Sequence, residues 1–289
     1  MDINWYPGHM KKATDAVKRA LPQVQLCLEI RDARIPRSSA NQQLGALVAH
    51  KKRIIILNKK DLADRSETDQ WIRALNREGQ IAMALDATDE HPAERIYQAA
   101  AALLAEKRDA RAQRKIINQE IRMMVFGIPN SGKSTVINAM AKRRTAKVGD
   151  RPGITTTEQW IRTDAQLLLL DTPGILPTKL EPEQALHLAF TGAIRDTILP
   201  QQDIGLELIR LLMQRDPDVF RRRYGIEATK PLEAMEQIGR SIGALLRGGE
   251  IDYTRTALRV VDDFRKLRYG AMTLETVKDL EHEARSLDS

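Results

Sequence analysis

The stretch that decides the fold of this chain is GIPNSGKS, residues 127–134. It matches the pattern G-x-x-x-x-G-K-[ST], and it lies between an apolar run (123–127) and a helical pattern (133–142), the setting that a phosphate-binding loop requires. Its glycines let backbone N–H groups surround phosphates at a helix N-terminus. Lys133 is predicted to reach the β- and γ-phosphates, and Ser134 to offer Mg²⁺ a hydroxyl ligand. The alternative, a glycine turn that caps a helix, is disfavoured by this setting. The loop residues predicted to bind nucleotide are Asn130, Ser131, Gly132, Lys133, Ser134 and Thr135.

The second motif is NKKD (58–61), directly after the apolar run RIIIL (53–57). Guanine offers its ring N1–H and its exocyclic amino group side by side, so the carboxylate of Asp61 can accept both. Adenine would leave that carboxylate unpaired, which disfavours its binding. Asn58 is predicted to hold the loops near guanine O6 and N7, and the Lys59 stem to cover the base. By itself the tetrapeptide is an ordinary polar turn, but beside a phosphate loop it predicts a guanine-nucleotide site for GTP and GDP.

The third motif is DTPG (171–174), after the apolar run QLLLL (166–170). Asp171 stands where a carboxylate at the end of a strand holds Mg²⁺, usually through water, and the Gly174 N–H can contact the γ-phosphate. A bare D-x-x-G is common, so this motif draws its meaning from its place about forty residues after the phosphate loop.

Two further loops complete the predicted site. The polar segment KVGDRPGITTTEQW (147–160) is expected to close on Mg²⁺ and the γ-phosphate, with Thr155 as the metal ligand and Thr156 as the alternative. Asp86 and Ala87 follow the apolar run QIAMAL, and the Ala87 N–H could reach guanine O6. The usual sequence at that place is Ser-Ala, so Asp86 is a departure.

The first 175 residues alternate short apolar runs with helical patterns, which predicts an α/β fold with a mostly parallel sheet covered on both faces. After about residue 200 only helical patterns remain, as in 231–246 and 252–269. We therefore expect a P-loop GTPase domain over residues 1–180 and a small all-α domain over residues 181–289. The predicted strands are 24–30, 53–57, 80–85, 123–127 and 166–170; the predicted helices between them are 42–49, 66–78, 93–105 and 133–142.

The order of the motifs is the distinguishing feature. NKKD precedes the phosphate loop by about seventy residues, whereas ordinary GTPases place the phosphate loop first. A circularly permuted chain can build the same site, because the loops still gather at the carboxyl edge of one parallel sheet. The permutation places the helical domain directly after DTPG, so a γ-phosphate-dependent movement there would pull on it.

Composition places few limits beyond these. The 289 residues are 42% hydrophobic and 29% charged, no apolar run is long enough to span a membrane, and the N-terminus has no apolar signal core. Together with the single cysteine, Cys27, this indicates a cytoplasmic protein. The net charge is +7, of which residues 1–199 carry +8 and residues 200–289 carry −1. The basic excess stands in short runs that are either solvated faces or a surface for RNA. In the near-neutral remainder, Arg221-Arg222-Arg223 is the local basic exception.

Several strings resemble the YlqF/RbgA family of circularly permuted ribosome-assembly GTPases, and the resemblance covers essentially the whole chain. It implies a factor in late assembly of the large ribosomal subunit; separately, we expect the protein to be a monomer. Such a factor binds ribosomal RNA, and the subunit stimulates its GTP hydrolysis. The strings are WYPGHMKKA (5–13), DARIPRSSAN (32–41), NKKD, GIPNSGKST and DRPGITT (150–156).

Catalysis differs from that of Ras-like enzymes, because Ile175 stands where a water-positioning glutamine is expected. The resemblance implies that His9 promotes hydrolysis; a structural or RNA-contacting histidine is the alternative. Asn130 resembles the asparagine of potassium-dependent GTPases, in which K⁺ replaces an arginine finger, although a tight loop also suits asparagine. The residues predicted to take part in catalysis are His9, Lys133 and Thr155.

Two other functional classes compete with a ribosome-associated GTPase. One is a nucleotide-switched module that binds RNA or protein and turns over GTP only incidentally, which Ile175 makes plausible. The other is a P-loop kinase or ATPase, against which NKKD argues.

Overall fold

The computed structural model describes residues 7–77, 79–86, 91–105, 120–141, 159–163, 165–177, 179–195 and 200–278, with side chains from Thr14 onward. The contacts between residues divide the chain into two compact units. Residues Glu181–Leu274 form a helical unit. The described residues up to Leu180, together with those from Glu275 to Lys278, form an α/β unit.

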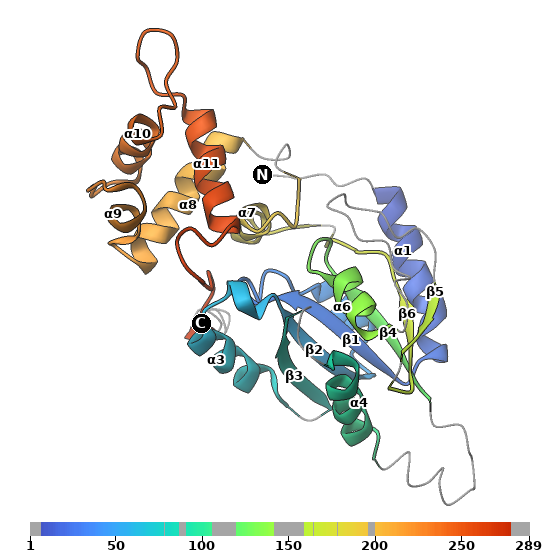
Figure 1. The fold of residues 1–289 in the computed structure, drawn as a ribbon. Coiled ribbons are helices and arrows are strands. Elements are labelled where there is room, and N and C mark those ends of the chain that lie inside the picture. Colours follow the sequence, from blue (N-terminus) through green and yellow to red (C-terminus); the bar gives the residue numbers. More distant parts are fainter. Residues whose placement is uncertain are drawn as a thin grey trace, which may run out of the picture. The chain divides into compact units, whose positions relative to one another are not determined.

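The α/β unit is built on a six-stranded sheet with the order β3-β2-β1-β4-β6-β5 (Figure 1). Five of these strands run parallel, and β5 pairs antiparallel with β6 at the edge. The predicted α/β class with a mostly parallel sheet is thereby confirmed. The strands are β1 (Leu26–Asp32), β2 (Lys52–Asn58), β3 (Gln80–Leu85), β4 (Ile121–Gly127), β5 (Gln159–Arg162) and β6 (Leu167–Asp171).

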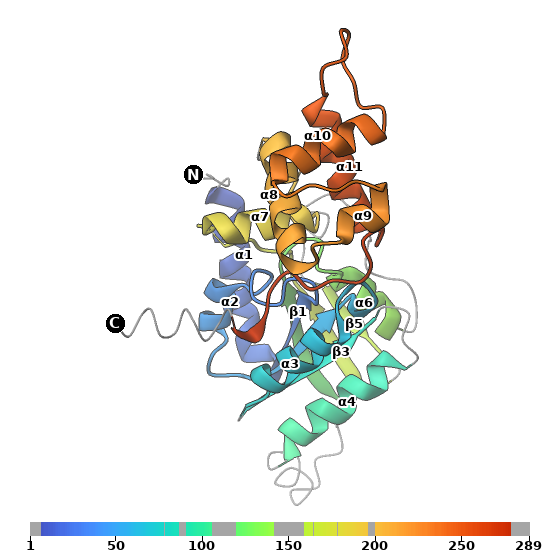
Figure 2. The ribbon, with the colours of Figure 1, turned by 90° about the vertical axis from the view of Figure 1, so that its left-hand side faces the viewer.

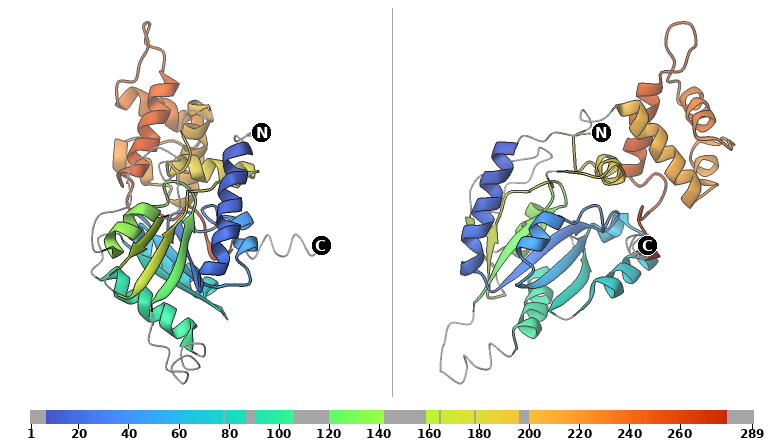
Figure 3. Two further views of the ribbon diagram at one scale, coloured as in Figure 1. Left: turned by 90° about the vertical axis from the view of Figure 1, so that its right-hand side faces the viewer. Right: turned by 180° about the vertical axis from the view of Figure 1, so that it is seen from behind.

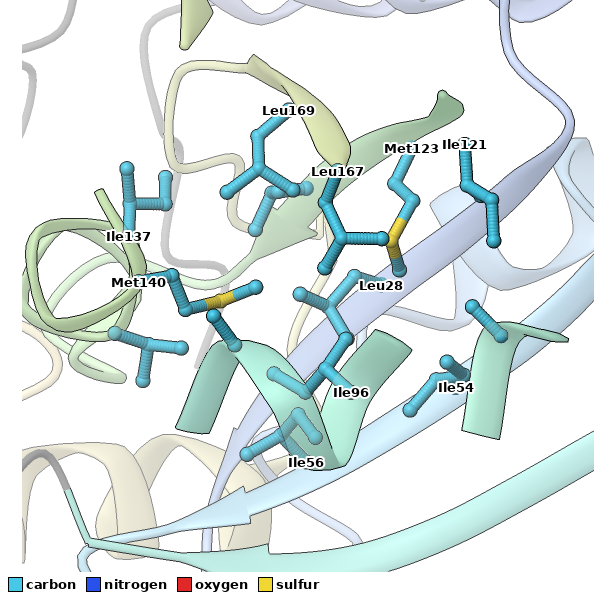
Figure 4. Packing of buried hydrophobic residues seen from close by; sticks show 14 of the residues in the cluster. Leu28, Ile54, Ile56, Ile96, Ile121, Met123, Ile137, Met140, Leu167 and Leu169 are labelled. Atoms are coloured by element: carbon cyan, nitrogen blue, oxygen red, sulfur yellow. The ribbon is translucent and has the colours of Figure 1, made fainter. Parts of the chain in front are cut away.

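Alternate residues of the central strands pack into hydrophobic cores on opposite faces of the sheet, as expected for strands covered on both faces. On one face, Leu28, Ile54 and Met123 pack with Ile96 of α4 (Pro92–Leu103) and Met140 of α6 (Lys133–Met140) (Figure 4). The helices α1 and α4 lie on opposite sides of the sheet (Figure 3). The elements on the opposite face are α1 (Pro7–Ala20), η1 (Leu21–Gln23), α2 (Gln42–Leu47) and α3 (Arg65–Leu75).

Within the helical unit, α8, α10 and α11 pack against one another (Figure 2). Gly205 of α8 lies so close to α11 that a Cβ atom there would fall 2.6 Å from the Cα of Ala257. None of the described helices is both long and apolar enough to cross a membrane. The helices are α7 (Pro182–Phe190), α8 (Gln201–Arg215), α9 (Val219–Tyr224), α10 (Pro231–Ser241) and α11 (Tyr253–Arg265).

The structure differs from the sequence prediction in several places; for example, the helix predicted over residues 231–246 ends at Ser241. Strand β5 begins in the last two residues of the stretch predicted to be a loop (147–160) and was not predicted; only Ile161 of its four residues is buried, so it lacks the apolar run of a covered strand. Helix α11 ends at Arg265 rather than near Gly270, and Leu267 follows it with a left-handed φ of 59°. The prediction assigned everything after residue 180 to the helical domain, whereas the described residues after Leu274 pack on the α/β unit.

This last segment is held by specific contacts. The buried carboxylate of Glu275 accepts hydrogen bonds from the backbone N–H groups of Arg37 (2.6 Å) and Ser38 (3.0 Å). The Trp71 indole N–H donates to the Glu275 carbonyl over 3.1 Å, and Val277 packs beside Trp71 in the same cluster. The chain therefore packs again on the α/β unit after it has formed the helical unit.

Candidate nucleotide-binding site

The phosphate loop joins β4 to α6 in a conformation that depends on small residues. Gly132, the N-cap of α6, has a φ of 89°, and Asn130 also lies in the left-handed region at 57°. A Cβ atom on Gly127 would fall 2.5 Å from the carbonyl oxygen of Ile30. These features turn the chain sharply into the N-terminus of α6, where free N–H groups favour an anion.

Lys133 and Asp171 face each other behind this loop as a buried ion pair. They are 6% and 2% exposed, respectively. Burial lowers the pKa of Lys133, while the charge of Asp171 opposes that change. Ser134 and Thr135 lie in the first turn of α6 and are half-buried. The Asp171 carboxylate and the Ser134 hydroxyl offer the oxygen ligands that Mg²⁺ prefers, so these residues fit this ion.

The NKKD loop contacts the phosphate loop directly. The Asn58 side-chain amide donates to the carbonyl of Ser131 over 2.9 Å, and Lys59 Nζ donates to the carbonyl of Asn130 over 2.8 Å. The Asn58 amide oxygen is buried and has no hydrogen-bond partner among the described residues. Two motifs that lie seventy residues apart in the sequence therefore meet at the carboxyl edge of the sheet, beside a polar atom that a donor group would satisfy.

Asp61 lies at the exposed rim of this edge. Partial burial raises the pKa of Asp61, the charge of Asp86 adds to the rise, and the positive charge of Arg34 opposes it. Asp86 is the residue that departs from the usual Ser-Ala sequence, and its negative charge acts on the carboxylate of Asp61.

The DTPG segment runs beside the phosphate loop. Its Thr172 hydroxyl donates to the Val125 carbonyl over 2.8 Å, and the Ile175 N–H donates to the Gly127 carbonyl over 3.3 Å. A Cβ atom on Gly174 would fall 3.1 Å from the backbone of Pro129. Ile175 is 2% exposed and packs in the core with Phe126, so its side chain is committed to packing.

Several predicted site residues lie outside the described residues: Ala87, Thr155 and Thr156. For His9 the structure describes only the backbone, within α1. Among the described residues, no group of three or more His, Cys, Asp and Glu side chains could hold a metal ion.

The triple arginine of the helical unit is paired internally. Arg221 contacts Asp218 at 3.1 Å, Arg222 pairs with Asp216, and Arg223 Nε donates to the buried carboxylate of Asp263 over 2.7 Å. Because each guanidinium faces a carboxylate, the local net positive charge is smaller than the three arginines alone would give.

Sequence reasoning missed two residues of this edge, Asp32 and Arg34. Both are buried, and Lys59 Nζ donates to Asp32 over 3.0 Å. The sequence feature that could have pointed to them is the string DARIPRSSAN (32–41), which carries part of the family resemblance and begins with both residues.

The fold and the meeting of these loops define a class, the circularly permuted P-loop GTPases. A family model described as "50S ribosome-binding GTPase" matches residues 122–231. The "Ribosome biogenesis GTPase A" of Bacillus cereus is 40% identical over 282 residues, which cover 96% of this chain and 95% of that protein. The protein of the same name from Bacillus licheniformis is 39% identical over 283 residues, covering 97% of this chain and all of that one.

Among solved structures, GNP-bound YlqF from T. maritima matches 92% of this chain and 98% of its own with a TM-score of 0.62 and 25% identity. The chain belongs to the ribosome biogenesis GTPase A (RbgA/YlqF) family.

Proposed function

We propose that this chain binds and hydrolyses GTP with Mg²⁺ and acts as a monomer in the cytoplasm, in late maturation of the large ribosomal subunit. The observation that carries the proposal is the meeting of Asn58 and Lys59 with the carbonyls of the phosphate loop. A polar, base-reading loop is thereby held beside a phosphate-binding helix N-terminus. The names of the matching relatives support the ribosomal role.

The site residues divide the work. Asp61 accepts the two guanine donors, and Lys133 balances phosphate charge from its buried position. Ser134 and Asp171, with Thr155, would hold Mg²⁺. When bound, this ion would offset the negative charge of the β- and γ-phosphates. The pair between Lys133 and Asp171 holds both side chains at the phosphate end of the site.

Hydrolysis needs a group from elsewhere, since Ile175 is packed in the core and cannot orient water. His9 is the candidate within the chain, and K⁺ beside Asn130 is a second. Alternatively, this same feature supports a nucleotide switch whose own turnover is incidental. In either case, intrinsic hydrolysis is expected to be slow.

The test is GTP hydrolysis by the pure protein, alone and with purified large ribosomal subunits, in matched K⁺ and Na⁺ buffers. Strong stimulation by the subunit supports the proposal, and His9→Ala should then remove most of it. Tight GTP binding without stimulation would overturn the ribosome-activated function and leave the switch. Binding to the subunit that weakens steeply with salt would support RNA contact.

A further inference from the structure

We propose that Asp32, together with Arg34, is a positioning residue for the guanine site, holding Lys59 of the NKKD loop in place. This inference rests on the proposed guanine-nucleotide function. It assigns a role to the start of the DARIPRSSAN loop, which contributes none of the residues predicted to touch nucleotide.

The carboxylate of Asp32 is surrounded by donors from two residues. Its Oδ1 accepts from the backbone N–H and the Nε–H of Arg34, each over 3.0 Å. Its Oδ2 accepts from Arg34 Nη2 over 2.8 Å and from Lys59 Nζ over 3.0 Å. Asp32 is 2% exposed, so these bonds lie away from water, where charge-assisted hydrogen bonds are strongest.

Burial alone would raise the pKa of Asp32, but the charges of Lys59 and Arg34 and their hydrogen bonds lower it well below its ordinary value. The carboxylate therefore stays ionised across the neutral range. A fixed negative charge stands at the carboxyl end of β1, beside Asn58, which is its register partner on β2.

Lys59 needs such an anchor because its backbone is in an unfavourable conformation. Its φ is 60°, in the left-handed region that a lysine adopts only at a cost. Its ammonium bridges the Asp32 carboxylate and the Asn130 carbonyl. The ammonium at the end of the stem predicted to cover the base is thus held between the end of β1 and the phosphate loop, and Asp32 is its charged partner.

Arg34 and Asp32 act on the pKa of Asp61 in opposite directions. The positive charge of Arg34 lowers the pKa of that carboxylate, whereas the negative charge of Asp32 raises it. The role proposed for the pair therefore rests on the hydrogen bonds that join Arg34 to Asp32 and Lys59 to Asp32.

The experiment measures Kd values for fluorescent GDP and GTP analogues with the full-length protein and the variant Asp32→Asn. Loss of one charge-assisted contact to Lys59 should weaken both nucleotides by about 10-fold or more. The ratio of the GTP and GDP affinities should stay unchanged, because the base end does not sense the γ-phosphate.

Glu29→Gln is the matched control. Glu29 lies on the same strand, is 1% exposed, and accepts from Arg31 (2.8 Å) and Arg53 (3.0 Å), away from the NKKD loop. It should lower thermal stability as Asp32→Asn does, while leaving nucleotide affinity as in wild type. Equal loss of affinity in both variants would mean a merely structural role and would overturn the proposal.

A double-mutant cycle tests the route through Lys59. Lys59→Met and the double variant Asp32→Asn/Lys59→Met should bind GDP within about 3-fold of each other, because Asp32 acts through the missing ammonium. A double variant at least 10-fold weaker than Lys59→Met would overturn the proposal. If wild type failed to prefer GDP over ADP, the proposed function itself would be wrong, whereas an intact preference with unchanged Asp32→Asn affinity would refute only this inference.

Discussion

Replacing Glu275 by alanine should destabilise the α/β unit, although the residue lies just beyond the helical unit. The change removes a buried carboxylate that accepts from two backbone N–H groups, those of Arg37 and Ser38. Hydrogen bonds to a charged group contribute about 1.5–3 kcal/mol each, so the loss of two should be about 3–6 kcal/mol. For a unit of this size that corresponds to a fall in Tm of roughly 6–24 °C.

The assay is thermal unfolding followed by tryptophan fluorescence, because Trp71 donates to the carbonyl of residue 275. Glu250→Ala, at an exposed position in the helical unit, is the control and should leave this transition unchanged. If Glu275→Ala melted within about 1 °C of wild type, the assignment of this segment to the α/β unit would be refuted.

Three further predictions concern the nucleotide site. In Gly132→Ala the new Cβ would overlap the Asn58 amide, and strain at a φ of 89° plus one lost hydrogen bond should weaken GDP binding roughly 30-fold. Gly225→Ala, with a φ of 68° and open space around it, should leave GDP binding intact; equal effects would contradict the argument. Because the pKa of Asp32 is lowered in the folded state, its stabilisation is present above its ordinary pKa and is lost on acidification. The Tm of Asp32→Asn should therefore fall less steeply than that of wild type between about pH 5 and pH 3, and parallel curves would argue against the ion pair. Ile175→Gln should lower stability by about 2–4 kcal/mol without faster GTP hydrolysis, since the side chain is packed in the core. Faster turnover at unchanged Tm would show that this position does face the reacting water.

The parts of the fold that the sequence predicts well are those with a strong local signal. Each of the five parallel strands contains an apolar run, and the phosphate loop carries its own pattern, so the place of Lys133 at the start of the following helix could be predicted from sequence alone. By contrast, β5 is an edge strand with one buried residue, Ile161, and it lacks the apolar run that marks a covered strand. Its pairing depends on β6, which lies later in the chain.

Contacts between distant segments were beyond sequence reasoning for the same reason. Nothing around Glu275 marks it as buried, because its partners are backbone N–H groups more than two hundred residues away. The sequence analysis gives Asp32 and Arg34 no role, because Lys59 comes beside Asp32 only through the pairing of the strands. Long-range pairing of this kind is set by topology, and no local pattern encodes it.

The central claim is that the Asp61 carboxylate recognises guanine by accepting hydrogen bonds from its ring N1–H and its amino group. The most direct measurement is competition between nucleotides with different bases for wild type and for Asp61→Asn. Wild type should prefer GDP to ADP and to xanthosine diphosphate. In Asp61→Asn the side-chain amide can donate to the oxygen that replaces the guanine amino group in xanthine. The variant should therefore lose GDP affinity by about 100-fold and prefer xanthosine diphosphate. A wild type indifferent to the base, or a variant that still prefers GDP, would contradict the account.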